Sequence, residues 1–136
     1  MNPEQQLQAK IIMSFSQQRP EERGQLWSTQ NRSLSLRDGQ TQKATGLFAG
    51  VSDLLYFKNK KLIAIEIKAP GSRHDKQHIQ NQFEWGQTIV NNGGEWYIIR
   101  TLDAFWCALT NKEHKDILTL TDVEIMLKTN NKTICF

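Results

Sequence analysis

The segment 50–69 constrains the fold of this chain more than any other, because it predicts two β-strands joined by a tight turn. The aromatic residues Tyr56 and Phe57 close the first strand, and the polar run 58–61 suits a turn better than a core. We therefore expect an antiparallel hairpin around which the rest of the chain is organised.

The register of this hairpin brings two acidic residues together. With the turn centred between residues 59 and 60, counting outward places Asp53 opposite Glu66. Directly opposed residues have Cβ atoms about 4.5–5.5 Å apart, where two carboxylates repel unless a cation lies between them. Lys68 shares the face of Glu66, because it follows two residues later. The other face is expected to be buried and consists of Ile63, Ile65 and Ile67.

Asp53, Glu66 and Lys68 are residue types that suit metal-assisted phosphodiester hydrolysis. Two hard oxygen donors suit Mg²⁺ or Mn²⁺, which prefer carboxylates and water to imidazole or thiolate. A nearby ammonium group can orient a water molecule or neutralise charge on a phosphoryl oxygen. The alternative is that an exposed hairpin carries these residues as solvated charges, with Glu66 and Lys68 as an ion pair on one face.

The same residues resemble a known motif. The segment 50–53 (Gly-Val-Ser-Asp), the step of thirteen residues to Glu66, and the triplet 66–68 (Glu-Ile-Lys) are similar to the PD-(D/E)xK nuclease superfamily, and within it to the VRR-NUC family. Ser52 departs from the family pattern, which usually has proline before the aspartate. Serine still permits an extended backbone at this position, so the departure is a small one.

Further parts of the chain fit the same family. Gln82, the Gly-Gly pair at 93–94 and the strand at 96–100 match its Gln-helix-Gly-Gly-strand pattern, and Glu4 matches its upstream acidic position. The resemblance covers most of the chain, from about residue 4 to about residue 109. It implies a restriction-endonuclease-like core, which is an α/β fold with a mixed β-sheet flanked by helices.

The resemblance also implies a function and a role for each site residue. The expected activity is that of a metal-dependent endonuclease acting on DNA, with Mg²⁺ or Mn²⁺ as cofactor. Lys68 is expected to orient the nucleophilic water or stabilise the transition state, and Gln82 to orient groups at the site. Structure-selective cutting of branched or four-way junction DNA by a homodimer is expected. The expected metal ligands are Asp53, Glu66, Glu4 and the main-chain carbonyl of Ile67.

Length and composition bound the class of protein. A chain of 136 residues is long enough for one modest core, so a single domain over 1–136 is expected. It contains no apolar run near eighteen residues and its N-terminus has no signal-peptide pattern, so we expect no membrane partner. Cys107 and Cys135 favour free thiols in a reducing compartment. Together these features predict a cytoplasmic protein, and we expect a bacterial or phage-like intracellular setting.

Cationic residues near the motif are candidates for contacts with DNA. The net charge of +3 permits a polyanionic partner without requiring one. Backbone phosphates reward flexible cationic side chains, whereas the alternative for each residue is a solvated surface charge. The candidate DNA-binding residues are Arg32, Arg37, Lys43, Arg73 and Lys76.

Other segments predict the elements that flank the hairpin. Asn2-Pro3 favours the start of a helix with apolar residues at helical spacing as far as Phe15, followed by a polar loop over 16–24. The remaining expected elements are short extended pieces at 26–27 and 34–36, a helix over 75–91 with Val90 on its apolar face, a strand over 96–101, and helices over 102–109 and 121–128. The tail after Asn111 either covers the core or supports self-association.

Four alternatives to the expected roles remain open from the sequence. Glu4 can simply complement the dipole of its helix, and Gln82 can be a helix-surface residue. His74 and His78 are spaced for zinc on one helix face, but a third ligand is not evident and His74 falls where the helix begins. A non-catalytic DNA-binding or scaffold protein on the same fold is the alternative function, although its hallmark would be a missing acid or lysine.

Overall fold

The computed structural model describes residues 1–29 and 48–136. Within these ranges the chain is an α/β protein with a five-stranded mixed sheet flanked by helices, as the sequence predicts. The strands lie across this sheet in the order β1 (Leu26–Ser28), β2 (Leu54–Lys58), β3 (Lys61–Ile67), β5 (Glu95–Ile99) and β6 (Ile117–Leu118). Strands β3 and β5 run parallel, and every other neighbouring pair in the sheet is antiparallel.

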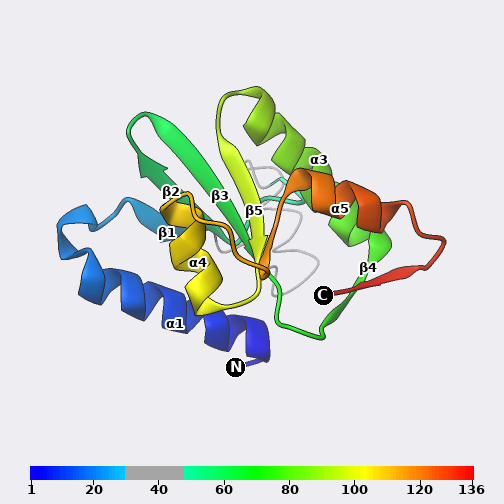
Figure 1. Cartoon of the computed structure of the whole chain (residues 1–136), viewed down its shortest axis with the longest axis horizontal. Helices are drawn as coiled ribbons and strands as arrows, with labels where there is room; N and C mark the ends of the chain where they lie inside the picture. The colour runs from blue at the N-terminus through cyan, green and yellow to red at the C-terminus, as the bar shows by residue number, and fades with distance from the viewer. Residues whose placement is uncertain (30–47) are drawn as a thin grey trace, which may run out of the picture.

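Helices cover both faces of the sheet (Figure 1). On one face, α1 (Pro3–Gln18) and α4 (Leu102–Leu109) pack over a cluster that includes Ile11 and Phe105. On the other face, α3 (Lys76–Asn91) and α5 (Leu120–Leu127) pack over a cluster centred on Trp96. Because the central strands β3 and β5 are covered on both sides, residues on both of their faces are buried, at 63–67 in β3 and at Trp96, Ile98 and Ile99 in β5.

The hairpin has the predicted register. Lys58 pairs with Lys61, Leu54 pairs with Ile65, and the same register extended by one residue sets Asp53 against Glu66. The two turn residues, Asn59 and Lys60, have φ angles of 54° and 63°. Positive φ at both central residues is what a two-residue hairpin turn needs to match the twist of its strands. The acid pair is therefore set by the turn chemistry that the sequence shows.

Most helix ends follow local signals, and α5 lies one residue earlier in the chain than predicted. Asn2 caps α1, since its side chain accepts a hydrogen bond from the Gln5 N–H and the Gln5 side-chain oxygen accepts one from the Asn2 N–H. Helix α4 has the predicted bounds, and α3 begins one residue later than predicted. The predicted loop over 16–24 was wrong in part, because α1 continues to Gln18 and Pro20–Glu22 form a 3-10 turn, η1.

The tail covers part of the core. Strand β7 (Thr133–Cys135) pairs antiparallel with β4 (Arg73–Asp75) in a second, two-stranded sheet. Ile134 and Phe136 are buried against the α3 face of the main sheet. Val90, in contrast, is 41 % exposed, so its predicted place on the buried face of the helix was wrong.

Several sequence predictions concern residues outside the described ranges. Arg32, Arg37, Lys43 and the extended piece at 34–36 all fall there.

Cys107 and Cys135 are free thiols. None of the helices in residues 1–29 and 48–136 is both long enough and apolar enough to cross a membrane.

Candidate active site

The candidate site lies where β3 ends, beside the approach to β2. Asp53 precedes β2, and its Oδ2 accepts a hydrogen bond from the Ile67 N–H at 2.9 Å. In a β-strand the N–H and C=O of one residue point to the same edge, so the Ile67 carbonyl faces the Asp53 side of β3. Asp53 thereby takes the place of a strand partner at the end of the hairpin.

Gly50 sets the path of the chain into this site. Its φ angle is +92°, and a Cβ atom there would lie 2.5 Å from the Asn81 carbonyl oxygen of α3. Only glycine permits both this backbone conformation and this close approach. The segment leading to Asp53 is therefore packed directly against the helix that carries Gln82.

Glu66 and Lys68 are buried, each only 2 % exposed. The sequence predicts one buried face and one chemical face of β3, and the structure buries the chemical face as well. Both residues point to the α3 side of the sheet, because Glu66 pairs with Ile98 and Ile98 lies in the Trp96 cluster. The alternative in which these two residues are solvated surface charges is excluded by the same burial.

The burial of Glu66 is only partly compensated. Burial and the neighbouring Asp53 carboxylate raise the pKa of Glu66 well above its ordinary value, and Lys68 opposes that shift. The Lys68 Nζ lies 3.5 Å from Glu66 Oε1. The other oxygen, Oε2, has no hydrogen-bond partner within the described part of the chain. A buried acceptor without a partner costs about 1–3 kcal/mol, so this oxygen favours an additional cation or donor.

Glu4 approaches the acid pair from the first turn of α1. Burial raises the pKa of Glu4, Lys68 lowers it, and Asp53 raises it again, so the three groups interact electrostatically. The direct contact of Glu4 is with another residue: its Oε1 lies 3.0 Å from His74 Nε2. Figure 1 shows the N-terminal end of α1 near the ends of β3 and β5. The sequence placed Glu4 in the site but gave no signal for its contact with His74.

Gln82 is buried rather than on the helix surface. It is 4 % exposed, its Nε2 lies 3.1 Å from His78 Nε2, and its Oε1 has no hydrogen-bond partner among the described residues. The surface alternative for Gln82 is therefore wrong. An amide held in the interior with a free acceptor is suited to orienting a water molecule or another polar group.

The two histidines do not form a zinc site with a third ligand. His74 lies in β4 and His78 in α3, with their rings stacked and the centroids 6.4 Å apart. Burial and the Lys68 charge lower the pKa of both rings, that of His74 to about 4. Across residues 1–29 and 48–136, no group of three His, Cys, Asp or Glu side chains is arranged to hold a metal ion. A zinc site with three such side chains is thus not formed by the described residues.

The donor set instead fits a hard divalent cation. Asp53 and Glu66 offer two carboxylates, and the Ile67 carbonyl faces the edge of β3 on which Asp53 lies. Mg²⁺ is commonly held by one or two carboxylates and retains several waters, so a third acidic side chain is not required. The unpartnered Oε2 of Glu66 supports this fit.

Two of the predicted DNA contacts fall within the described residues. Arg73 is exposed at the start of β4. Lys76 donates its N–H to the Lys132 carbonyl and its Nζ to the Thr129 carbonyl, both in the segment between α5 and β7. Lys76 thus holds the tail, which the sequence did not indicate, whereas Arg73 remains available to solvent.

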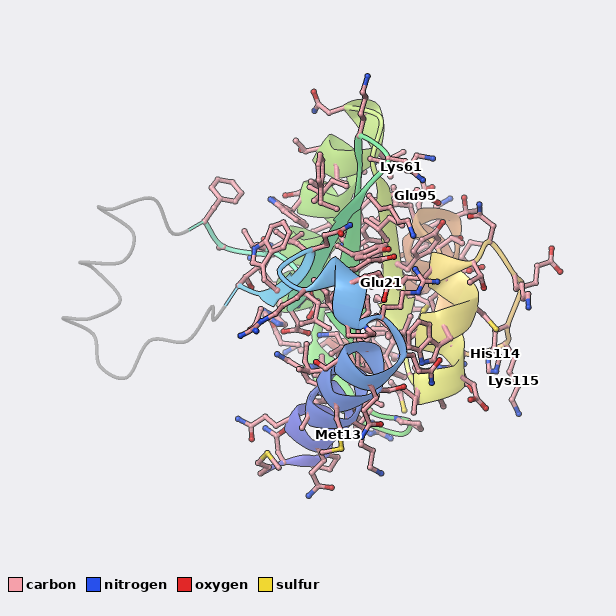
Figure 2. All side chains as sticks on the ribbon, turned by 90° about the vertical axis from the view of Figure 1, so that its left-hand side faces the viewer. Met13, Glu21, Lys61, Glu95, His114 and Lys115 are labelled. Atoms are coloured by element: carbon pink, nitrogen blue, oxygen red, sulfur yellow. The ribbon has the colours of Figure 1, made fainter. Side chains whose placement is uncertain are left out.

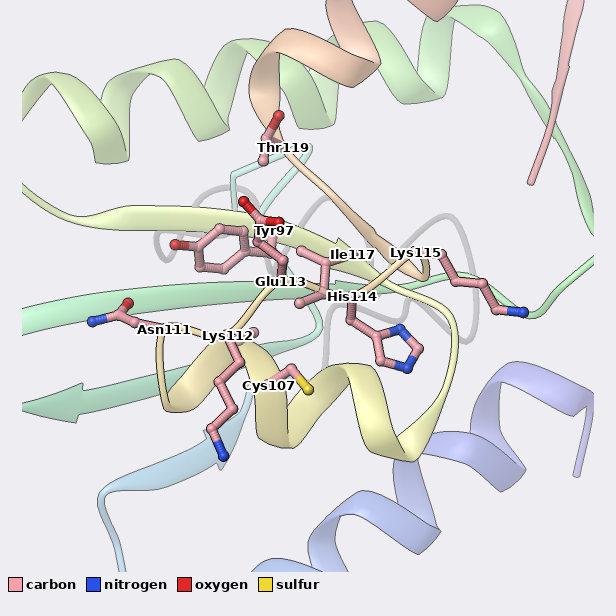
Figure 3. A pocket seen from close by; sticks show the side chains of 10 residues that line it. Tyr97, Cys107, Asn111, Lys112, Glu113, His114, Lys115, Ile117 and Thr119 are labelled. Carbon is pink, nitrogen blue, oxygen red and sulfur yellow. The ribbon is translucent and has the colours of Figure 1, made fainter.

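A separate hollow lies on the other face of the sheet. Its volume is about 680 Å³. Its lining includes Tyr97 of β5, Cys107 of α4, and two residues of the loop between α4 and β6, Glu113 and His114 (Figure 3). Tyr97 alternates with Ile98 along β5 and contacts the Ile11 cluster, so it points away from the acid pair. The hollow contains none of the predicted site residues.

Comparisons of the chain with protein-family models, with curated proteins and with solved structures found no match. The resemblance to the VRR-NUC family, and the restriction-endonuclease-like core that it implies, therefore stay predictions from the motif residues. The described residues establish an α/β fold with a mixed five-stranded sheet, in which Asp53, Glu66 and Lys68 meet at one end of the hairpin.

Proposed function

We propose that this protein is a metal-dependent endonuclease that hydrolyses DNA phosphodiester bonds. One observation carries the proposal: the buried Glu66 carboxylate lies beside Asp53 and Lys68 while its Oε2 has no partner among the described residues. Two neighbouring carboxylates in a site of low dielectric repel strongly, and one ammonium group offsets only one of their charges. A bound divalent cation removes that imbalance.

The residues that would hold Mg²⁺ or Mn²⁺ are Asp53, Glu66 and the Ile67 carbonyl, with Glu4 as an outer member. When bound, such an ion lowers the pKa of a water molecule and polarises a phosphoryl oxygen. These are hard oxygen donors, which favour Mg²⁺ or Mn²⁺ over softer metals.

The side chains of the chain supply the rest of the chemistry. Lys68 keeps its ammonium group 3.5 Å from Glu66, where it can orient the attacking water or stabilise charge that develops on the phosphoryl group. Gln82 has an unpartnered Oε1, which is available to accept a hydrogen bond from a polar group bound at the site. Because Lys68 is buried, its charge acts with little screening by solvent.

The proposal is tested by cleavage of supercoiled DNA in Mg²⁺ or Mn²⁺ by the wild type and by Lys68→Met, which keeps the length of the side chain without its charge. We expect the wild type to nick or linearise the DNA and Lys68→Met to be slower by about 10²–10³-fold. A wild type that cuts nothing, or a variant that cuts equally fast, would contradict the mechanism.

The substrate we propose is branched DNA, including four-way junctions, cut by a homodimer. A two-fold symmetric dimer matches the symmetry of a junction. A panel of junctions, flaps and linear duplex, run beside light scattering, tests both parts. Equal cutting of linear duplex would favour a nicking or restriction-type enzyme, and a monomer in solution would count against the dimer.

A second candidate is a non-catalytic DNA-binding or scaffold protein on this fold. The observation in its favour is that Lys68 is 2 % exposed and already paired with Glu66, as in a structural ion pair. Calorimetric titration separates the two functions, because only the nuclease is expected to bind Mg²⁺ or Mn²⁺ at the acid pair.

A further inference from the structure

Glu4 is the one acidic residue of the predicted site that does not belong to the hairpin. It stands in the first turn of α1, and its side chain is 28 % exposed. A glutamate side chain at such a position has several rotamers available, and holding it in one costs conformational entropy. If Glu4 is to act at the acid pair, another group must select its orientation.

His74 makes the contact that selects it. Its Nε2 lies 3.0 Å from Glu4 Oε1 and 3.1 Å from Ser72 Oγ. The Ser72 hydroxyl donates its hydrogen to the Ala69 carbonyl at 2.6 Å, so its oxygen can only accept from the ring. An ionised carboxylate also only accepts. Both contacts fit a ring hydrogen on Nε2, which the Ser72 hydroxyl oxygen and the Glu4 carboxylate would share.

The position of His74 is itself fixed by the tail. His74 pairs with Ile134 across β4 and β7, and its ring meets the Phe136 ring edge-on with centroids 5.7 Å apart. The His78 ring stacks on the His74 ring, with an angle of 22° between the two ring planes. Because packing restricts the ring from several directions, its Nε2–H is a preorganised donor rather than a mobile one.

We propose that His74 is a positioning residue, which holds the Glu4 carboxylate toward the acid pair at the end of the hairpin. The inference rests on the proposed nuclease function, and it extends the site to β4 and to the tail that supports it. His74 acts through Glu4 and does not itself touch the reacting atoms. Removal of such a supporting residue typically weakens metal affinity by about 10–100-fold.

The test measures Mn²⁺ affinity of the intact chain by titration calorimetry, with DNA cleavage alongside. His74→Phe keeps a ring against Phe136 but removes the donor, whereas His74→Gln offers an amide N–H near the position of Nε2. We expect His74→Phe to weaken Mn²⁺ binding at least about tenfold and His74→Gln to recover most of it. Should His74→Phe not fold, His74→Asn replaces it, because its shorter amide does not reach Glu4.

The same measurement in a Glu4→Gln background separates positioning from general support. Since His74 acts through Glu4, His74→Phe is expected to have little further effect on Mn²⁺ binding once Glu4 is replaced. An undiminished effect in that background, or no effect in the wild-type background, overturns the inference while leaving the proposed function intact. A wild type that neither binds Mn²⁺ nor cuts DNA overturns the proposed function and this inference together.

Discussion

Two buried glutamates in this protein have opposite surroundings. Glu22, in η1, is 7 % exposed and accepts hydrogen bonds from the Tyr56 hydroxyl and from Lys58 Nζ at 2.7 Å, with Arg19 at 3.4 Å. Glu66 is more deeply buried, and it has one cation at 3.5 Å and a second carboxylate beside it. The chain therefore satisfies one acid with donors and sets the other against a like charge.

The pKa shifts of the two residues express this difference. Burial by itself raises the pKa of Glu22, but the hydrogen bonds from Lys58 and Tyr56 and the Arg19 charge together lower it below the ordinary value. Burial and Asp53 raise the pKa of Glu66 well above that value, and Lys68 does not reverse the shift. A fully partnered acid is a structural feature, whereas an acid left short of partners is typical of a functional site.

The largest expected effect comes from removing the charge of Glu66. Glu66→Gln is expected to slow DNA cleavage by about 10³-fold, which is about 4 kcal/mol in the activation free energy, since it removes a metal ligand. The free energy of unfolding without metal should change little, because the repulsion with Asp53 disappears while the buried Lys68 loses the charge of its partner. Cleavage rates and urea unfolding measure both quantities, and cleavage within tenfold of wild type would contradict the assignment.

The reverse pattern is expected at Glu22. Glu22→Leu leaves the buried Tyr56 hydroxyl and the Lys58 ammonium group without their acceptor, so the free energy of unfolding should fall by about 1–3 kcal/mol. Cleavage by the folded variant should match the wild type. Glu22→Gln is the control, since it keeps an acceptor for Tyr56 and should cost less. A Glu22→Leu variant that is as stable as the wild type but cleaves DNA at a different rate would contradict the structural role of Glu22.

A smaller effect is expected in the pH dependence of stability. Because folding lowers the pKa of Glu22, its ionised form stabilises the protein fully above the unfolded value of 4.5. That contribution is lost as the pH falls below 4.5 through the lower folded-state pKa. The urea unfolding midpoint should be measured from pH 6 to pH 3 in steps of about half a pH unit. It should fall less steeply with decreasing pH for Glu22→Gln than for the wild type. Parallel curves would mean that Glu22 does not contribute to the acid transition.

The smallest effect is expected for a third glutamate, which is near the surface. Lys61 Nζ lies 3.6 Å from Glu95 Oε2, and Figure 2 shows the two side chains at the outer end of the sheet. Exposed ion pairs contribute about 0–1 kcal/mol, so Lys61→Ala should change the free energy of unfolding by less than about 1 kcal/mol. A larger loss of unfolding free energy in 0.15 M salt would show that the degree of burial does not by itself explain the difference between Glu22, Glu66 and Glu95.

Local signals predicted the hairpin and most helix bounds because their causes are local. The turn at Asn59 and Lys60 fixes the register, and the Asn2 cap fixes the start of α1. The acid pair could therefore be predicted by counting. The supporting contacts could not: His74 meets Glu4, and Lys76 meets Thr129, across long stretches of sequence.

The burial of the site was also beyond prediction from the sequence. Alternation along β3 shows that Glu66 and Lys68 share a face, but it does not show what covers that face. The cover is provided by α3 and by a tail to which the sequence assigned no chemistry, with the Phe136 ring 5.9 Å from Lys68 Nζ. The partners of Glu22 were missed for the same reason, because Tyr56 and Lys58 lie on a strand far along the chain.

The sequence by itself determined which residues pair across the hairpin, since turn geometry and strand periodicity act over a few neighbouring residues. Only the tertiary structure decided how much water, charge and hydrogen bonding each acid receives, because these depend on elements brought together by packing. Glu22 and Glu66 are the same type of residue, yet they differ in their protonation equilibria and, as we propose, in their function.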